Sequence, residues 1–414
     1  MKNKKAIMYL LIANAVSGVS QGISLISITW FVSNTLGKPA FFGTMFLAAT
    51  LFSIPWGTYA GTLVDKHDRK KIMLFIQSFG LILVLGTALA GFYLGRDALW
   101  MAMIVYFSTV VAYNIHYPNL YAFAQEITEK ENYSKITSWI EIQGQTSFAI
   151  AGALGAILLE GKIMNFDFGK WSLHEIFLLD AVTYLVALLF LFLIKYESLA
   201  ERDKSKANIF NRLKDGFVYL TSSPKILLFG VITGVIFAGS LVTGMYSLPI
   251  LIKTFIGGTE KVYGFTEGAF ALGALMSGIF IFSVFSKKNL VLGLLMLHIT
   301  ATVCFFFMGI NQNVILLYII YCIVGFTNAG TRILRVTYLF NVIPNKFIGR
   351  ANSIFSVINA SLRVILISIF SSAFFIEDDN IRYAMFILSA LVFIGVLVLS
   401  FNFNIFRKLN QSAH

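Results

Sequence analysis

Apolar residues follow one another along this chain in long runs that short polar segments interrupt. A helix that crosses a bilayer needs about 20 mainly apolar residues. Twelve runs reach that length, so the pattern predicts twelve membrane-spanning helices. Their expected bounds are 6–32, 41–64, 72–94, 98–123, 136–159, 175–194, 226–252, 262–285, 290–309, 314–339, 351–375 and 381–404.

The polar segments are short except for the one between the sixth and seventh runs, which divides the helices into two groups of six. We therefore expect an N-terminal bundle at 1–198, a linker at 199–225 and a C-terminal bundle at 226–414. Within the linker, the stretch IFNRLKDGFVYL alternates apolar and polar residues at helical spacing. This pattern predicts an amphipathic helix on the membrane surface, although a solvated linker also fits it.

The basic residues orient the predicted helices. With the N-terminus inside, the inner loops and tails hold 22 of the 32 Lys and Arg residues, and the outer loops hold 7. Positively charged loops remain on the cytoplasmic side of a membrane. Because the number of helices is even, both termini are predicted to be cytoplasmic.

The composition agrees with a membrane protein, since 57% of the 414 residues are hydrophobic and only 13% are charged, against about 25% charged in soluble proteins. The net charge of +12 lies in short loops rather than on a face interleaved with aromatics, which excludes a nucleic-acid-binding protein. Cys304 and Cys322 lie in apolar runs without a ligand at metal-binding spacing, so neither a metal nor a cofactor is expected.

The stretch GTLVDKHDRKKIM, residues 61–73, concentrates charge between the second and third runs. Gly61, four residues after Gly57, allows another backbone to approach closely. Asp65 can accept hydrogen bonds at the start of the third helix, and Arg69 and Lys70 hold the loop inside. Such a cluster can lock one arrangement of the helices, so we interpret Gly61, Asp65, Arg69 and Lys70 as a gating motif.

This stretch resembles G-x-L-x-D-[RK]-x-G-R-[RK], the loop signature of the major facilitator superfamily, with Asp68 at a position that is usually Gly. Its D-K-H-D-R-K-K-I-M portion is similar to the macrolide-efflux branch, the drug:proton antiporter-3 group. His116 with Pro118, and Gly349 with Arg350, also resemble that branch. The resemblance implies an all-α membrane protein of major facilitator fold, with 12 transmembrane helices in two pseudo-symmetric six-helix bundles.

Two features depart from the family pattern. Antiporters of this superfamily often carry an arginine in the fourth helix that is linked to proton transfer, and this chain has Thr109 near that place. The fifth helix reads AGALGA, residues 151–156, without the proline of the family's G-P-x-x-G-G. Both departures are evidence against proton antiport.

Strongly polar side chains near the middle of a predicted span are costly and therefore indicate function. Arg363 lies deepest, with Asn359 one turn away on the same face, and can hold an anionic group or form a structural ion pair. Arg332 and Arg335 lie nearer the inner end, where snorkelling to the headgroups is the alternative. The predicted substrate cavity contains Gln21, Gln145, Asn359, Arg363, Arg332 and Arg335.

Three titratable residues are candidates for proton coupling: Glu141, Asp180 and His116. A carboxylate in a cavity of low dielectric constant can take up a proton near neutral pH. For Glu141 and Asp180 the alternative is stabilisation of a helix start. For His116, which is close to a helix-bending proline, the alternative is simple packing.

The sequence thus predicts a monomeric secondary transporter of the bacterial cytoplasmic (inner) membrane that works by alternating access. The resemblance to the macrolide-efflux branch implies export of a small amphipathic molecule such as a drug or macrolide, driven by protons, with membrane lipid as the surroundings. An anionic metabolite or siderophore, bound through the intramembrane arginines, is the alternative substrate. An enzyme is not expected, because no acid–base cluster or H-E-x-x-H motif occurs.

Overall fold

The structure is a computed structural model that describes residues 4–129, 132–163, 166–195, 209–285 and 290–411. Within these residues, twelve helices are long and apolar enough to cross a membrane, as the hydrophobic runs predict. These candidate spans are Lys4–Thr35, Pro39–Gly57, Arg69–Leu94, Leu99–Glu126, Ile142–Glu160, Leu173–Leu193, Pro224–Ile256, Glu260–Ile281, Leu290–Met308, Val314–Val342, Phe347–Phe370 and Arg382–Phe401.

The chain forms two compact units, each described here by itself. Unit 1 comprises Met1–Ser205 and Glu260–Gly268, and unit 2 comprises Lys206–Thr259 and Ala269–His414. The expected domain boundaries at 198/199 and 225/226 stay predictions. Residues 199–208, the first part of the expected linker, lie outside the described residues.

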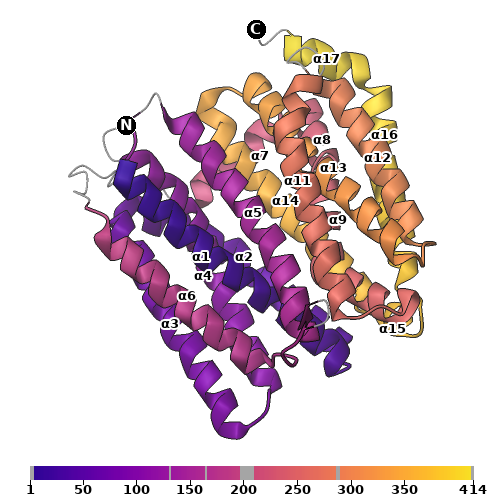
Figure 1. Ribbon diagram of the computed structural model, residues 1–414. Helices are drawn as coiled ribbons and strands as arrows, with labels where there is room; N and C mark the ends of the chain where they lie inside the picture. Colours follow the sequence, from indigo (N-terminus) through magenta and orange to yellow (C-terminus); the bar gives the residue numbers. More distant parts are fainter. Residues whose placement is uncertain (1–3, 130–131, 164–165, 196–208, 286–289, 412–414) are drawn as a thin grey trace. The chain divides into compact units, whose positions relative to one another are not determined.

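Unit 1 is built around its first helix. That helix packs on three others, α4, α5 and α6, while α3 packs on α4 and α6, and α2 packs on α4 (Figure 1). The helices are α1 (Lys4–Trp30), extended by the π-helical η1 (Phe31–Thr35), α2 (Pro39–Lys66), α3 (Arg69–Leu94), α4 (Leu99–Glu126), α5 (Tyr133–Glu160) and α6 (Leu173–Leu193). Close packing depends on small residues, since a Cβ on Gly22 of α1 would lie 2.6 Å from the Ala151 Cβ of α5.

A short hairpin connects α5 and α6. Its strands, β1 (Lys162–Ile163) and β2 (Phe166–Asp167), pair antiparallel with Lys162 opposite Asp167. The Lys162 Nζ lies 3.1 Å from the Asp167 Oδ2 in an exposed ion pair. The hydrogen bond from Lys162, and then that from the Gly169 N–H, lower the pKa of Asp167 below its ordinary value.

The first span of unit 2 is not the single helix that its continuous apolar run predicts. It consists of α8 (Pro224–Ile232), α9 (Val235–Val242), the π-helical η3 (Thr243–Ser247), α10 (Leu248–Leu251) and the π-helical η4 (Ile252–Ile256). The break falls at Thr233 and Gly234. There the Gly234 N–H bonds to Val231 O, 3.0 Å away, instead of continuing the i→i−4 ladder to Gly230 O.

In unit 2, α12 packs on α13, α16 and α17, while α14 packs on α7 and α9. The helices that follow the broken span are α11 (Glu260–Val284, beginning in unit 1), α12 (Leu290–Met308), α13 (Val314–Val342), α14 (Asn345–Phe370), the short α15 (Ala373–Ile376), α16 (Arg382–Phe401) and α17 (Phe403–Gln411). The run expected at 381–404 therefore ends at Phe401, and a separate amphipathic helix follows. Helix α17 is fixed by the Tyr338 hydroxyl, which donates to Phe406 O at 3.0 Å.

Helix α7 (Ile209–Thr221) lies where the linker sequence predicts an amphipathic helix, and it packs on α14. The Asp215 Oδ2 lies 3.0 Å from Arg350 Nη1, and the Tyr219 ring stacks on Phe347 with centroids 4.6 Å apart. Gly216 allows this contact, because a Cβ there would lie 2.6 Å from Arg350 O. One face of α7 is thus covered by protein.

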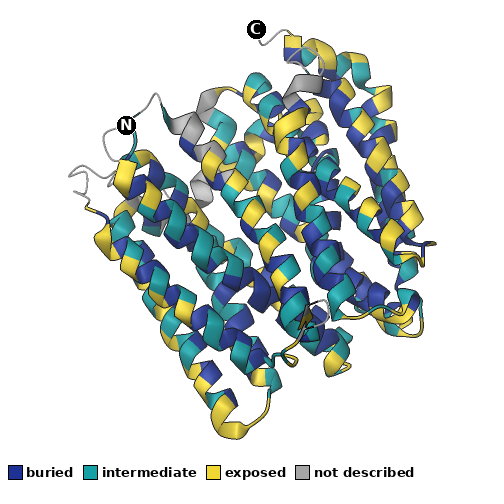
Figure 2. Ribbon diagram, viewed as in Figure 1, coloured by how far each residue is buried: buried dark blue, intermediate teal, exposed yellow. Residues whose placement is uncertain are grey.

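Large apolar side chains are exposed along the outsides of both units, as the exposed stripes on the helices in Figure 2 show. Examples are Phe75 (69% exposed) and Ile82 (69%) on α3, and Ile315 (69%) on α13. Helices satisfy their own backbone hydrogen bonds, so such apolar surfaces are suited to hydrocarbon.

Candidate functional site

Helix α1 carries a buried polar stripe that faces the interior of unit 1. Asn14, Ser17, Gln21 and Ser24 recur at intervals of three and four residues, and all four are buried. This interval places them on one face of a helix. Of the four, only Gln21 belongs to the predicted cavity.

Asn14, at the N-terminal end of this stripe, links α1 to α4 and α5 through amide and imidazole groups. The Asn14 Nδ2 of α1 donates to the Gln143 Oε1 of α5 at 2.7 Å. The His116 Nε2 of α4 lies 2.7 Å from Asn14 Oδ1, and because an amide oxygen only accepts, this nitrogen is the donor. His116 is therefore buried and hydrogen-bonded, as its packing alternative expects, and it also belongs to a continuous polar network.

Ser24, at the C-terminal end of the stripe, binds a carboxylate of another helix. Asp180 of α6 is fully buried, and the Ser24 hydroxyl donates to its Oδ2 at 2.8 Å. The Asp180 Oδ1 is also buried, without a hydrogen-bond partner in the part of the chain that the structure describes. Asp180 was expected near the start of its helix, yet it lies two turns inside α6.

Other residues stabilise the start of α6. The Asp97 carboxylate accepts from the N–H groups of Leu173, at 2.8 Å, and His174, at 3.1 Å. Ser172 and Glu175 form a reciprocal capping box. Helix-start stabilisation therefore does not explain Asp180, and a buried carboxylate bonded to α1 is the arrangement that needs a functional explanation.

The charge pattern of unit 1 isolates this carboxylate. Residues 6–37, 39–65, 72–94, 97–129, 136–161 and 171–194 contain no lysine or arginine. A buried carboxylate without a cationic partner favours its neutral, protonated form, because the charged form loses hydration. The surroundings of Asp180 thus suit a group that takes up and releases a proton.

The loop between α2 and α3 fastens three helices of unit 1 together. Asp68 caps α3 by accepting from Lys71 N at 2.9 Å, which accounts for an acid at the position where the family signature has Gly. The Arg69 Nη1 donates to Ala122 O of α4 at 2.5 Å and lies 3.5 Å from Glu126 Oε2. The Lys70 Nζ donates to Ile194 O at the end of α6, at 2.7 Å.

In unit 2, two of the predicted cavity residues hold the broken helix. The Asn359 Nδ2 of α14 donates to Gly234 O at 2.8 Å, and the Arg335 Nη2 of α13 donates to Gly230 O at 3.3 Å. Arg363, one turn beyond Asn359, is half-buried. Arg332 is exposed, whereas Arg335, one turn further along α13, is half-buried.

The remaining predicted residues divide into two groups. Gln21 is buried and Gln145 is half-buried, but Gln143 rather than Gln145 makes the contact to α1. The surroundings of Gly61 and the side chains of Asp65 and Glu141 lie outside what the structure describes.

Sequence reasoning missed Asn14, Ser24 and Gln143. The interval of three and four residues between polar positions of the first helix was the signal that could have identified the first two.

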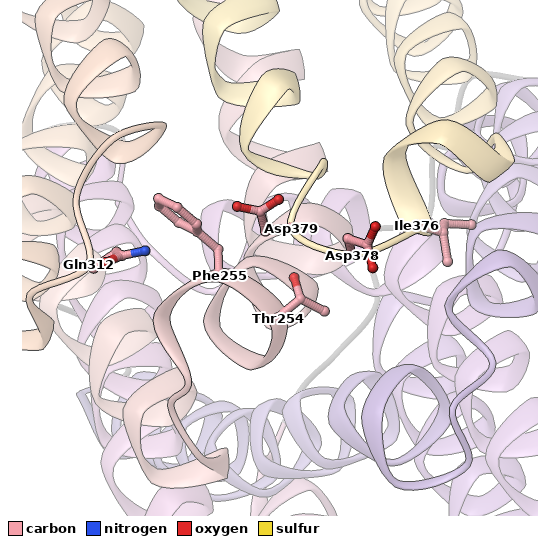
Figure 3. Close-up of a pocket in the computed structure, with 6 residues that line it drawn as sticks. All are labelled: Thr254, Phe255, Gln312, Ile376, Asp378 and Asp379. Carbon is pink, nitrogen blue, oxygen red and sulfur yellow. The ribbon is translucent and has the colours of Figure 1, made fainter.

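A pocket of about 540 Å³ occurs in unit 2 near the ends of the spans, and Figure 3 shows the residues that line it: Thr254, Phe255, Gln312, Ile376, Asp378 and Asp379. The Arg382 Nη1 lies 3.3 Å from the Asp379 Oδ2, and the Arg382 guanidinium also lies over the Phe255 ring. None of the predicted site residues lines this pocket. Among the described residues, no group of three or more His, Cys, Asp or Glu side chains could hold a metal ion.

Comparison with known proteins gives consistent matches along the chain. The family model of the Major Facilitator Superfamily matches residues 10–367. Macrolide efflux protein A of Streptococcus pyogenes is 23% identical over 418 residues, covering 96% of this chain and 95% of that protein. Macrolide efflux protein A of Enterococcus faecalis is 26% identical over 271 residues, covering 63% of this chain and 75% of that protein.

Solved structures share the fold at low identity. A nucleoside transporter, NupG, superimposes with a TM-score of 0.71 at 12% identity, covering 96% of this chain and 99% of that one. A D-xylose–proton symporter superimposes with a TM-score of 0.68 at 12% identity, covering 95% of this chain and 96% of that one. Identities this low establish the architecture alone.

Proposed function

The chain belongs to the major facilitator superfamily, and from this premise we propose that it is a secondary active transporter that exports a small amphipathic organic molecule in exchange for protons. The observation that carries export is the match, over nearly the whole chain, to a protein named for macrolide efflux. Transport in this class proceeds by alternating access of a central site to the two sides of the membrane.

Proton coupling rests on the carboxylate of Asp180. It is fully buried, hydrogen-bonded to Ser24, and lies in residues 171–194, a stretch that contains no lysine or arginine. When protonated it is neutral and compatible with an apolar interior, and when ionised it requires hydration or a cation. Alternating access supplies the change between these conditions. Glu141 and His116 are secondary candidates in the same proposal.

The α2–α3 loop is proposed to gate this cycle. Arg69 and Lys70 bind backbone carbonyls of α4 and α6, so the loop holds those helices together in the conformation described here. Release of these two contacts would allow the helices to separate. Gly61 and Asp65 belong to the same proposed motif.

The proposed location is the bacterial cytoplasmic (inner) membrane, with both termini cytoplasmic and the protein working as a monomer in contact with lipid. The excess of basic residues in alternate loops supports this orientation. The small-molecule substrate and the proton are its proposed partners.

The experiment that tests coupling uses inside-out vesicles and erythromycin, with Asp180→Asn as the variant. Asparagine keeps the size and the hydrogen bond of Asp180 but cannot release a proton. We expect the variant to lose accumulation driven by a pH gradient while it retains exchange of labelled for unlabelled erythromycin, which needs no net proton movement.

Ser24→Ala is the matched control, since it removes the hydrogen bond to Asp180 and leaves the carboxylate. It should weaken accumulation without abolishing it. Wild-type accumulation that persists after the pH gradient is collapsed would eliminate proton coupling, and accumulation by Asp180→Asn equal to wild type would eliminate Asp180 as the coupling group.

One observation favours a second candidate substrate class, an anionic metabolite or siderophore. Arg335 and Arg363 lie in spans of unit 2, and residues 216–259, 269–376 and 380–414 contain no aspartate or glutamate. The stretch of unit 2 that carries Arg335 therefore contains no carboxylate.

A further inference from the structure

The helix break in unit 2 brings a cationic and an amide side chain to one place. Because the Gly234 N–H bonds to Val231 O, the carbonyl of Gly230 loses its usual helical donor. The Arg335 Nη2 donates to this carbonyl at 3.3 Å. One turn on, the Asn359 Nδ2 donates to Gly234 O at 2.8 Å. The polar ends of α13 and α14 side chains therefore meet at the break.

Two aromatic rings flank the guanidinium. The Arg335 Cζ lies 5.1 Å from the centroid of the Phe355 ring and 5.8 Å from that of Phe237. Gly230 makes room for Phe355, since a Cβ on Gly230 would lie 2.2 Å from that ring. Rings at this distance stabilise a guanidinium and also provide an apolar surface beside it. The site thus combines a cation with an apolar wall.

The hydrogen-bonding capacity of Arg335 exceeds what the protein supplies. A guanidinium has five N–H donors. The Arg335 Nε is buried and has no hydrogen-bond partner among the residues that the structure describes. A buried donor without an acceptor loses its hydration without compensation, which is unfavourable. A stable arrangement of this kind indicates that another molecule provides an acceptor during the working cycle.

Unit 2 also contains few acidic residues that could serve as a counterion for Arg335. Apart from the segments 206–215 and 377–379, unit 2 contains no acidic residue. In those segments, Asp215 pairs with Arg350 and Asp379 with Arg382. An unpaired charge inside a span is expensive, and a planar guanidinium matches a carboxylate through two parallel hydrogen bonds.

We propose that Arg335 binds the carboxylate of an amphipathic transported molecule, with Phe237 and Phe355 in contact with its apolar part and Asn359 holding the helix break open beside it. This inference rests on the proposed transport function and narrows its substrate class.

The test uses two fluorescent dyes that differ in one group: a rhodamine with a free benzoate and its methyl ester. Uptake of each is measured in inside-out vesicles with the full-length protein. Wild type should transport the free carboxylate in preference to the ester. Arg335→Gln should lower transport of the carboxylate by about tenfold or more, because it removes the charge partner, and should change transport of the ester by less than about twofold.

Arg407→Gln is the matched control, the same change at an exposed position of α17 in unit 2. It should leave both dyes unaffected. Arg335→Lys, which keeps the charge but not the planar fork, should retain part of the carboxylate transport. Thermal unfolding of each purified variant verifies that it is folded.

The outcomes separate this inference from the proposed function. Wild-type transport of the ester alone, or equal loss of both dyes in Arg335→Gln, would overturn the carboxylate site and leave export intact. If wild type transports neither dye, both the export of amphipathic molecules and the carboxylate site are contradicted. The wild-type comparison requires no variant, so it holds even if Arg335→Gln fails to fold.

Discussion

At the scale of single residues, several polar side chains of this protein form hydrogen bonds with main-chain groups of other segments. Arg69 and Lys70 bind carbonyls of α4 and α6, and Asn359 and Arg335 bind carbonyls of the broken helix. Asp97 binds the first N–H groups of α6. Helix ends and breaks leave such groups without helical partners, and Asp97, Asn359 and Arg335 supply partners at the start of α6 and at the break in unit 2.

Asp97 gives a direct prediction of stability. Asp97→Ala removes the acceptor for Leu173 N and His174 N, and it also removes the partner of the His174 imidazole, whose Nδ1 lies 2.7 Å from Asp97 Oδ1. Loss of a cap costs about 0.5–2 kcal/mol, so the midpoint of thermal unfolding of the purified protein should fall.

Asp167→Ala is the matched control, because it deletes an acid from an exposed ion pair with Lys162. Exposed pairs contribute about 0–1 kcal/mol, so its unfolding midpoint should remain close to that of wild type. Equal shifts in the two variants would contradict the capping role of Asp97.

The identities of several important residues, but not their partners, could be read from the sequence. Arg335, Asn359 and Asp180 attract notice because polar groups are rare in apolar runs. Their partners are the carbonyls of Gly230 and Gly234 and the hydroxyl of Ser24, which lie far away in sequence or belong to the main chain. No pattern of side chains along one helix predicts those contacts.

At the scale of elements, hydropathy predicts the spans well and their interruptions poorly. The run at 226–252 is apolar throughout, so the break at Thr233 and Gly234 and the π-helical turns after it leave no trace in an average over 20 residues. Helix α17 was missed for a different reason. It has nine residues, too few for a span, and its apolar side is covered by unit 2.

The packing of α7 on α14 predicts an unusual effect of a glycine substitution. Alanine normally stabilises a helix interior relative to glycine by about 0.5–1 kcal/mol. Gly216→Ala should instead destabilise the contact by about 1–3 kcal/mol, because the new methyl group collides with Arg350 O. Faster proteolytic cleavage within α7 would show that the helix has detached.

Gly144→Ala provides the comparison, since a Cβ at Gly144 of α5 meets no atom within 4 Å. This variant should be neutral or slightly more stable, with unchanged cleavage of α7. A Gly216→Ala protein that is as resistant as wild type would show that α7 does not depend on this close approach.

At the scale of the whole molecule, the arrangement of charge distinguishes the two units. In unit 1, Asp180 is buried among stretches of sequence without lysine or arginine, and in unit 2, Arg335 lies in a stretch without aspartate or glutamate. Neither group has an oppositely charged residue within those stretches. This division suits a protein that handles a proton with one unit and an anionic group with the other.

The proposed orientation predicts which positions are open to the cell exterior. Glu377 and Lys408 are both exposed and are separated by one span, α16. In a chain whose Cys304 and Cys322 are replaced by serine, Glu377→Cys should react in intact cells with a thiol reagent that cannot cross membranes. Lys408→Cys should react only after the cells are opened.

The reverse labelling pattern would invert the proposed orientation. Reaction of both cysteines from the same side would show that α16 does not cross the membrane.

The contact between Arg335 and Gly230 has a mechanical consequence. A transported molecule that binds the Arg335 guanidinium would break its hydrogen bond to Gly230 O. The oxygen would then have no donor, at a cost of about 1–3 kcal/mol in apolar surroundings. The nearest replacement donor is the Gly234 amide, which reaches that oxygen only if the interrupted span straightens. Binding of the transported molecule and straightening of the helix would then involve the same few atoms. Substrate binding would therefore itself start the conformational change of this span.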